Sequence, residues 1–250
     1  MLENEDVLPR FLVSDLDPQR GSARLTGGEA RHLTRVLRLG PGDDVAVFDG
    51  RGTEFRGIVD RVTAGVVIVR LVEPVRPVAD RQVPITLAQA VLKGSSMDDV
   101  VRDATMMGVI RIVPLVTAHT VAHRAASPLA RERWLRVAVA SAKQCRRARV
   151  PEVAAALPFD AWLASTGDGL SLLLVEPSHE GAAPIPVRAL LTRDRPSSIN
   201  LVVGPEGGLT GAEVEAAIAA GHVPVTLGSL TLRAEAVPLA ACAALSVVWD

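Results

Sequence analysis

The stretch that decides the fold reads Ile199-Asn200-Leu201-Val202-Val203-Gly204-Pro205-Glu206-Gly207-Gly208-Leu209-Thr210. Its first five residues form a short, largely apolar run typical of a buried strand. Three glycines and a proline follow, and Thr210 with Glu213 three residues later forms the capping pattern of a helix start. In parallel sheets, ligands bind at loops that leave the carboxyl ends of the strands. The loop is therefore either a ligand site built from bare backbone or a tight turn that needs glycine for its conformation alone.

A second loop of similar character follows the next expected strand. It reads Leu227-Gly228-Ser229-Leu230-Thr231-Leu232-Arg233 and is too short and too interrupted to form a strand itself. Leucines beside a glycine suit the apolar wall of a pocket for an adenine ring or a thioether. The alternative is that they only plug the end of the sheet. Two such loops after consecutive strands favour a shared pocket.

The alternation of strands and helices extends outward from these loops over the region 85–250. Such alternation predicts a parallel sheet with helices on both faces. The expected strands are Ile85–Val91, Val109–Leu115, Leu170–Val175, Ile199–Val203 and Val223–Leu227. Four helices are expected, and they start at Ser96, Pro128, Gly211 and Glu235. We expect Ser96 to cap the first of them. The second is expected to run to near Pro151, and its apolar stripe consists of Leu135, Ala138, Val139 and Ala142.

The first third of the chain has a different pattern. Short β-branched runs predict strands, and Asp49-Gly50 between two of them is a strong hairpin signal. One helix is expected over Gly28–Leu39, with Leu33, Val36 and Leu37 on its apolar side. Closely spaced short strands with one helix predict a small barrel. The expected division is a barrel domain over 1–76, a proline-rich linker over 77–84 and the alternating domain over 85–250.

Composition excludes several classes of protein. A hydrophobic fraction of 48% and a charged fraction of 22% are those of a globular chain and not of a disordered or collagen-like one. No apolar run is long enough to span a bilayer and the start is acidic, so we expect a cytoplasmic protein with no membrane partner. The two cysteines form neither a disulfide framework nor a zinc cluster, and His119 and His123 lack companion ligands, so no metal site is expected. No dinucleotide or P-loop fingerprint is present.

The charge of the chain is unevenly distributed although its net value is only −1. Between residues 131 and 149, seven basic residues face a single acid, Glu132. A concentrated basic patch of this kind can bind a phosphate backbone, and it can equally be a solvated helix face. The basic residues are Arg131, Arg133, Arg136, Lys143, Arg146, Arg147 and Arg149.

An ordered set of motifs resembles the RsmE-type methyltransferases of the SPOUT superfamily, which modify N3 of a uridine in 16S ribosomal RNA. The final motifs are Gly204-Pro205-Glu206-Gly207-Gly208, Leu227-Gly228 and Leu232-Arg233-Ala234-Glu235-Ala236. Upstream motifs agree in the same order: His32-Leu33 with Val36-Leu37-Arg38, Gly42-Asp43, Phe48-Asp49-Gly50, Lys93-Gly94, Gly108-Val109, and Gln144-Cys145 with Arg147 and Pro151. The resemblance covers almost the whole chain.

The resemblance implies an α/β knotted domain with a trefoil knot and an N-terminal PUA-like β-barrel that holds RNA. It implies S-adenosylmethionine as cofactor, 16S rRNA in the small ribosomal subunit as substrate, and a homodimer with its active site near the subunit boundary. Arg233, with Arg147 as second choice, is the expected catalytic cation. The expected cofactor-binding residues are Val203, Gly204, Pro205, Glu206, Gly207, Gly208, Leu227, Gly228, Leu230, Leu232 and Arg233. The expected RNA-binding residues are Arg38, Lys143, Arg146, Arg147 and Arg149.

The chain departs from the family pattern at several positions. Met106-Met107 stands where Glu-Leu is usual, Lys143 replaces a frequent glutamate, and Ala234 and Ala236 replace two hydroxyl residues. The alanines motivate one alternative, an RNA-binding ribosome assembly factor with this fold and no activity. A second alternative is an enzyme of the same fold that methylates another RNA position. Binding of S-adenosylmethionine separates the first alternative from an enzyme.

Overall fold

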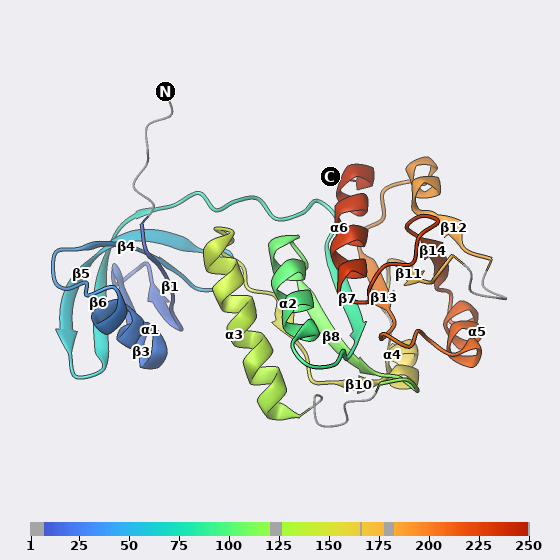
Figure 1. The fold of residues 1–250 in the computed structure, drawn as a ribbon. Helices are drawn as coiled ribbons and strands as arrows, with labels where there is room; N and C mark the ends of the chain where they lie inside the picture. Colours follow the sequence, from blue (N-terminus) through green and yellow to red (C-terminus); the bar gives the residue numbers. More distant parts are fainter. Residues whose placement is uncertain (1–7, 121–126, 166, 178–182, 250) are drawn as a thin grey trace. The chain divides into compact units, whose positions relative to one another are not determined.

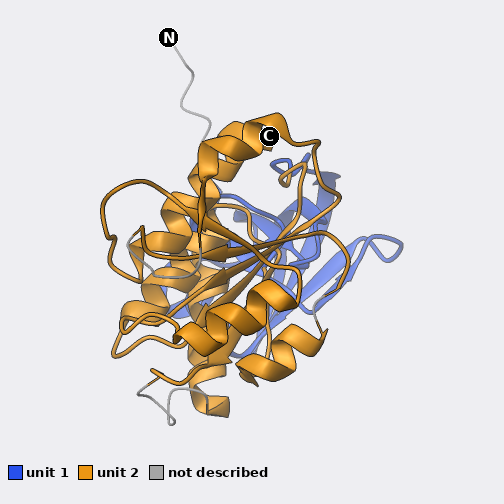
Figure 2. Cartoon of the chain, turned by 90° about the vertical axis from the view of Figure 1, so that its right-hand side faces the viewer, with its two compact units in different colours: residues 1–79, 142–150 blue, residues 80–141, 151–250 orange. Residues whose placement is uncertain are grey.

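The computed structural model describes residues 8–120, 127–165, 167–177 and 183–249. It divides into two compact units (Figure 2). Unit 1 contains residues 1–79 together with 142–150, and unit 2 contains residues 80–141 and 151–250. Unit 1 is therefore discontinuous in sequence, because the short segment 142–150 packs with residues from the first 79.

Unit 1 is built around a six-stranded sheet with the order β1-β4-β5-β6-β3-β2. Every neighbouring pair is antiparallel except β1 and β4, which are parallel. The expected hairpin is confirmed, since β4 and β5 pair in antiparallel fashion from Asp44↔Ile58 to Phe48↔Glu54. The strands are β1 (Arg10–Leu12), β2 (Asp15–Asp17), β3 (Ser22–Thr26), β4 (Asp44–Phe48), β5 (Glu54–Thr63) and β6 (Val66–Pro74).

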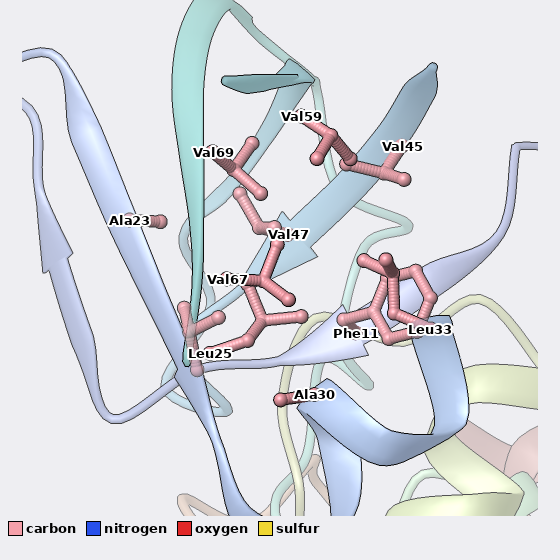
Figure 3. Close-up of a cluster of buried hydrophobic side chains, with 11 residues drawn as sticks. Phe11, Ala23, Leu25, Ala30, Leu33, Val45, Val47, Val59, Val67 and Val69 are labelled. Atoms are coloured by element: carbon pink, nitrogen blue, oxygen red, sulfur yellow. The ribbon is translucent and has the colours of Figure 1, made fainter. Parts of the chain in front are cut away.

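Alternating residues of these strands point inward and form the core of unit 1 (Figure 3). Phe11, Val45, Val47 and Val67 have no exposed surface. Valine dominates this core because a pleated, half-buried surface favours β-branched side chains.

The helix expected over Gly28–Leu39 is shorter than predicted. It consists of α1 (Gly27–Arg31) and one π-helical turn, η1 (His32–Val36). Leu33 is fully buried as expected, but Val36 and Leu37 are 66% and 41% exposed, so the prediction was wrong for them. Val36 is the last residue of the π-helical turn, whose i→i+5 spacing differs from the α-helical period on which the prediction was based.

Unit 2 has a parallel sheet with the order β10-β8-β7-β13-β11-β14-β12, in which β9 pairs with β8, as the alternation predicted. The strand Ile199–Val203, β13, lies in its interior between β7 and β11 and is buried along its whole length. The other strands are β7 (Ile85–Ala90), β8 (Arg111–Val116), β9 (Glu152–Val153), β10 (Leu157–Pro158), β11 (Leu170–Leu174), β12 (Ile185–Pro186) and β14 (Val223–Thr226).

Helices cover both faces of this sheet (Figure 1). On one face α4 and α5 pack through Phe159, Trp162, Val214 and Ala217. On the other face α2 and α6 lie side by side and pack against each other. The helical segments that lie wholly in unit 2 are α2 (Ser96–Met106), α4 (Phe159–Ser165), the 3₁₀ segment η2 (Val187–Thr192), α5 (Gly211–Ala219) and α6 (Ala236–Trp249). No helix in the described residues is long and apolar enough to cross a membrane.

The basic helix α3 (Pro128–Gln144) ends earlier than predicted. Arg146 adopts a φ of +61°, a left-handed conformation that terminates the helix well before Pro151. Its buried stripe contains Trp134, Ala138 and Ala142, whereas Leu135 is 45% exposed and was wrongly placed inside.

The cap expected at Ser96 was also misplaced. The helix α2 begins at Ser96, and Ser95 precedes it as the N-cap residue without a side-chain capping bond.

Candidate functional site

The glycine loop after β13 is held in one conformation by contacts from several elements. Buried Gln89, near the end of β7, donates from Nε2 to the carbonyl of Gly204 at 3.2 Å. The backbone N–H of Lys93 donates to Glu206 Oε1 at 2.9 Å. His119, just after β8, lies with Nδ1 at 2.9 Å from the carbonyl of Gly207 and 3.1 Å from that of Gly208. Because a carbonyl only accepts, Nδ1 carries the proton.

The helix start beyond this loop is capped as the sequence predicted. Thr210 Oγ1 accepts from the N–H of Glu213, and the Glu213 carboxylate accepts from the N–H of Thr210 at 2.9 Å. The other oxygen of that carboxylate accepts from the N–H of Ala118 at 2.8 Å. The loop is therefore held at both ends and along its length by hydrogen bonds to other residues of the chain.

A side chain at Gly207 would be crowded for a steric reason that the sequence did not show. A Cβ added there would lie 3.2 Å from Cβ of His119, so the close approach is to another loop of the protein. At Gly208 the requirement is conformational, since its φ is +69°.

The loop after β14 borders the same cavity and has few anchors. Thr226 Oγ1 donates to the carbonyl of Gly228 at 3.0 Å, and Arg233 forms an ion pair with Glu235 at 2.9 Å. Leu230 is 78% exposed and Leu232 is 40% exposed, which is unusual for two leucines in one short segment.

These two loops and the end of β11 enclose a cavity of about 210 Å³ in unit 2. Nine of the eleven residues expected at the cofactor site line it. Gly228 and Arg233 belong to the second loop and do not line the cavity. The lining residues are Leu174, Val175, Glu176, Pro177, Val203, Gly204, Pro205, Glu206, Gly207, Gly208, Leu209, Val214, Thr226, Leu227, Leu230, Thr231, Leu232, Ala234 and Val237.

Sequence reasoning missed the contribution of β11 to this cavity. Leu174 to Pro177 stand at the end of an expected strand and just after it, but the order that places β11 between β13 and β14 is not visible in the sequence. Gln89, Lys93 and His119 were missed as supports of the loop for the same reason, since β7 and β8 are distant in sequence from β13. Ligand sites in parallel sheets lie at the carboxyl ends of the strands. This rule, if it is applied to every expected strand, points to the ends of β7, β8 and β11 as well.

The cavity is lined by acidic and apolar side chains and by backbone groups. Glu176 and Glu206 bring two carboxylates, and no basic side chain lines the cavity in the described part of the chain. Apolar side chains and bare backbone provide the remaining surface. Such a lining repels polyphosphates and favours a ligand that combines an apolar ring system with positive charge.

The expected catalytic and RNA-binding residues are not gathered at this cavity. Arg233 lies beside it in unit 2 with a side chain that is 86% exposed. Arg147, the second choice, is buried in unit 1 with 5% exposure. Lys143, also in unit 1, is half-buried and ion-paired to Glu29. Arg38, Arg146 and Arg149 are exposed residues of unit 1.

The remaining histidine and cysteine residues considered in the sequence lie away from this cavity or outside the described residues. His123 lies outside the described residues. Cys145 and Cys242 are both free. Burial raises the pKa of the Cys242 thiol to about 11.

A parallel sheet with a cavity at the carboxyl ends of its strands, joined in one chain to a β-rich unit, is the architecture of a two-domain α/β protein with a ligand site. The RNA methyltransferase domain model matches residues 79–246, and the RNA methyltransferase PUA domain model matches residues 25–71. The chain therefore belongs to this RNA methyltransferase family, which includes the ribosomal RNA small subunit methyltransferases E.

Curated relatives and solved structures support the same family assignment. The chain is 33% identical to the ribosomal RNA small subunit methyltransferase E of Synechocystis, covering 96% of this chain and 78% of that one. Its identity to the Mycobacterium tuberculosis enzyme of the same name is 31%, covering 96% and 93%.

Two solved structures that hold S-adenosylmethionine share the fold. The ribosomal RNA small subunit methyltransferase E of Neisseria gonorrhoeae matches with a TM-score of 0.83 and 27% identity, covering 97% of this chain and 98% of that one. A putative methyltransferase of Legionella pneumophila matches with a TM-score of 0.85 and 26% identity, covering 96% and 97%.

Proposed function

We propose that this protein methylates N3 of a uridine in 16S ribosomal RNA of the small subunit. Its family makes it an S-adenosylmethionine-dependent rRNA methyltransferase. The observation that carries the proposal is the cavity between the two loops, whose lining suits that cofactor, in a fold that relatives share while holding it.

The cofactor site proposed is the cavity itself. S-adenosylmethionine, when bound, supplies an electrophilic methyl group on a positively charged sulfur. Glu176 and Glu206 provide negative charge that favours a cationic ligand, and the leucines at 227, 230 and 232 offer an apolar surface. The residues of the glycine loop, Val203 to Gly208, provide backbone donors and acceptors. Gly228 and Arg233 act from the margin of the site.

The chemical task of the chain is to place uracil N3 in line with the methyl group and to favour loss of its proton. Positioning supplies much of the rate of such a transfer. The uracil anion that develops requires a nearby cation. We assign this role to Arg233, because its guanidinium is exposed beside the cavity. Arg147 is the second candidate, although its side chain is only 5% exposed.

The RNA-binding role falls to exposed cations of unit 1. Arg38, Arg146 and Arg149 have side chains that a phosphate can reach. Lys143 already neutralises Glu29, and Arg147 is buried, so both are weaker candidates than the sequence indicated.

The proposed activity is tested with small ribosomal subunits that lack the modification. Incubation with the protein and S-adenosylmethionine is expected to add one methyl group, which mass spectrometry of RNA digests locates at N3 of one uridine. A methyl group on a ribose or on another base would instead support a different RNA position. Neither calorimetric binding of S-adenosylmethionine nor methyl transfer would be observed for the assembly-factor alternative, because a pure binding module needs no cofactor.

We further infer that the chain is a homodimer through α6. Leu239, Ala243 and Val247 lie on one side of this helix and are exposed, with Val247 at 84%. An exposed apolar stripe of this kind fits an isologous contact with a second copy. Light scattering is expected to show a dimer that Ala243→Arg splits, with activity falling in parallel. A monomeric active enzyme would contradict this inference.

The trefoil knot and the cytoplasmic location are also proposals. The knot is proposed because the motifs of the chain resemble those of the SPOUT superfamily, and the loops that would form it follow β13 and β14 and meet at one cavity. An experimental trace through residues 199–249 tests it. Co-sedimentation of the protein with ribosomal subunits in cell extracts tests the location.

A further inference from the structure

His119 stands on a turn that follows β8, whose carboxyl end lies on the same side of the parallel sheet as that of β13. Thr117 and Thr120 close this turn and are only 7% and 6% exposed. The N–H of Thr117 donates to Oγ1 of Thr120 at 3.0 Å, and the N–H of Thr120 donates to the carbonyl of Thr117 at 3.1 Å. Between them, the N–H of Ala118 donates to Glu213 at 2.8 Å. The backbone that carries the imidazole is therefore fixed.

The contacts of the imidazole itself decide which of its nitrogens can accept a proton. Nδ1 of His119 lies 2.9 Å from the carbonyl of Gly207 and 3.1 Å from that of Gly208, so Nδ1 donates and carries the proton. In the neutral ring the lone pair is then on Nε2, which points away from the glycine loop. His119 is exposed, and no described residue forms a hydrogen bond with Nε2. The result is an oriented base that is open to solvent.

The glycine at position 207 lets this base approach the cofactor cavity. A Cβ on Gly207 would lie 3.2 Å from Cβ and 3.4 Å from Cγ of His119. Gly207 and Gly208, whose carbonyls contact the ring, both line the cavity. The imidazole therefore lies within hydrogen-bond distance of the backbone that borders the proposed cofactor, and its open nitrogen faces the solvent from which a uracil arrives.

The carboxylates nearby are less suited to take a proton from uracil. Both oxygens of Glu213 accept from backbone N–H groups, and Oε1 of Glu206 accepts from the N–H of Lys93. Glu176 is exposed and lines the cavity. A general base is most effective when it changes its protonation near the operating pH, as an imidazole does and an ordinary carboxylate does not. This favours His119 over the three glutamates.

We propose that Nε2 of His119 is the proton acceptor of the methyl transfer, and the inference rests on the proposed function for the identity of the nucleophile, uracil N3. In this step the N3–H bond breaks and its proton passes to Nε2. The electron pair left on N3 forms a bond to the methyl carbon. The bond from that carbon to the sulfonium sulfur breaks, and its electron pair stays on sulfur. The products are a methylated uridine, S-adenosylhomocysteine and an imidazolium, which returns its proton to water.

The two glycine carbonyls assist this role of His119. When Nε2 gains a proton the ring becomes positively charged, and the hydrogen bonds from Nδ1 to the carbonyls of Gly207 and Gly208 become charge-assisted and stronger. The carbonyls therefore do what a carboxylate does for the histidine of a hydrolase triad: they hold the tautomer and stabilise the imidazolium.

The first test is the pH dependence of single-turnover methylation of small ribosomal subunits, at saturating S-adenosylmethionine. In the wild type, the rate is expected to rise tenfold per pH unit while the imidazole is protonated and to level off once it is neutral. His119→Asn keeps a donor near the position of Nδ1 but cannot accept the proton. Its rate at pH 7 is expected to be roughly 10²- to 10⁴-fold lower and to rise without levelling off up to pH 8, because hydroxide then takes the proton.

Two further measurements separate a chemical role from a structural one. Free imidazole is expected to restore methylation by His119→Ala in proportion to the concentration of its neutral form. In the absence of RNA, ¹⁵N NMR of the histidine-labelled wild type is expected to show the proton of neutral His119 on Nδ1. Glu176→Gln is the matched control, since it removes a cavity carboxylate: it is expected to weaken cofactor binding and to leave the plateau of the pH profile in place.

A wild-type rate and plateau in His119→Asn, or a proton on Nε2 of the neutral ring, would overturn the inference. So would loss of the plateau in Glu176→Gln in place of His119→Asn. Transfer of the methyl group to a ribose hydroxyl would refute the proposed function, and the same pH profiles and imidazole rescue would still decide the role of His119, because that reaction also releases a proton. A wild type that methylates no RNA would refute both.

Discussion

The two loops that border the cavity differ in how they are held. The loop from Gly204 to Gly208 is supported by Gln89, by the backbone of Lys93 and by His119. The loop from Leu227 to Arg233 is held only by local contacts near its two ends among the described interactions, and it presents Leu230 with 78% of its surface exposed. One loop is preformed by its surroundings, and the other offers apolar surface for a ligand to bury.

This difference separates two contributions to affinity. A preformed loop lowers the entropy cost of binding, because its backbone groups are already oriented. Exposed leucines contribute by removing their own surface and that of the ligand from water. Changes in the supports of the first loop should therefore affect both stability and affinity, whereas changes in the second loop should affect affinity alone.

The largest effect is expected from Gln89→Leu. The substitution at fully buried Gln89 removes the donor to the carbonyl of partly buried Gly204, and an acceptor that loses its partner costs roughly 1–3 kcal/mol. Calorimetry should show affinity for S-adenosylmethionine falling by about tenfold or more, with a lower melting temperature. An unchanged affinity would show that the loop keeps its shape without this support.

A smaller effect on affinity, with no effect on stability, is expected from Leu230→Ala. Loss of the apolar surface that the ligand would cover costs about 1–2 kcal/mol of binding. The melting temperature should stay at the wild-type value because the side chain is largely exposed. Leu129→Ala on α3, where the leucine is 75% exposed, is the matched control and should change neither quantity. A drop in stability for Leu230→Ala would break the distinction between the loops.

A still smaller effect is expected at His119. His119→Ala removes an exposed hydrogen bond to the glycine loop, which is worth about 1 kcal/mol and corresponds to a loss of about fivefold in cofactor affinity. His119→Asn keeps an N–H near the position of Nδ1 and should restore most of that affinity. Equal losses in both variants would show that the imidazole acts in some way other than supporting the loop.

The smallest effect concerns the strand that carries the second loop. His222 precedes β14 and is 2% exposed; burial lowers its pKa below 6.5, and the hydrogen bond to Ala217 only partly opposes this. The imidazole of His222 therefore binds a proton more readily in the unfolded chain than in the folded one. Neutral His222 contributes its full stability above pH 6.5, and this contribution is lost as the pH falls through the lowered pKa of the folded state. Denaturant unfolding at pH 7 and pH 5 should show a smaller loss of stability in His222→Phe than in the wild type.

Much of the fold was predictable from local patterns. The hairpin at Asp49-Gly50, the parallel sheet and the capping box of Thr210 with Glu213 all depend on residues close in sequence. The errors arose where a local feature depended on its surroundings. Leu135 belongs to an apolar pattern, but the buried stripe of α3 contains Trp134 and Ala138. Val36 is exposed at the end of a π-helical turn, whose spacing differs from the α-helical period.

The sequence by itself determined that a glycine loop follows a buried strand, that a second, leucine-bearing loop follows the next strand, and that motifs of one methyltransferase family occur in order. These features are read from neighbouring residues, whose spacing fixes period, turns and caps. Only the tertiary structure decided that β11 lies between β13 and β14 and that Gln89 and His119 support the glycine loop. Contacts between distant segments depend on which packing buries the most apolar surface while pairing every buried polar group, and that is a property of the whole chain.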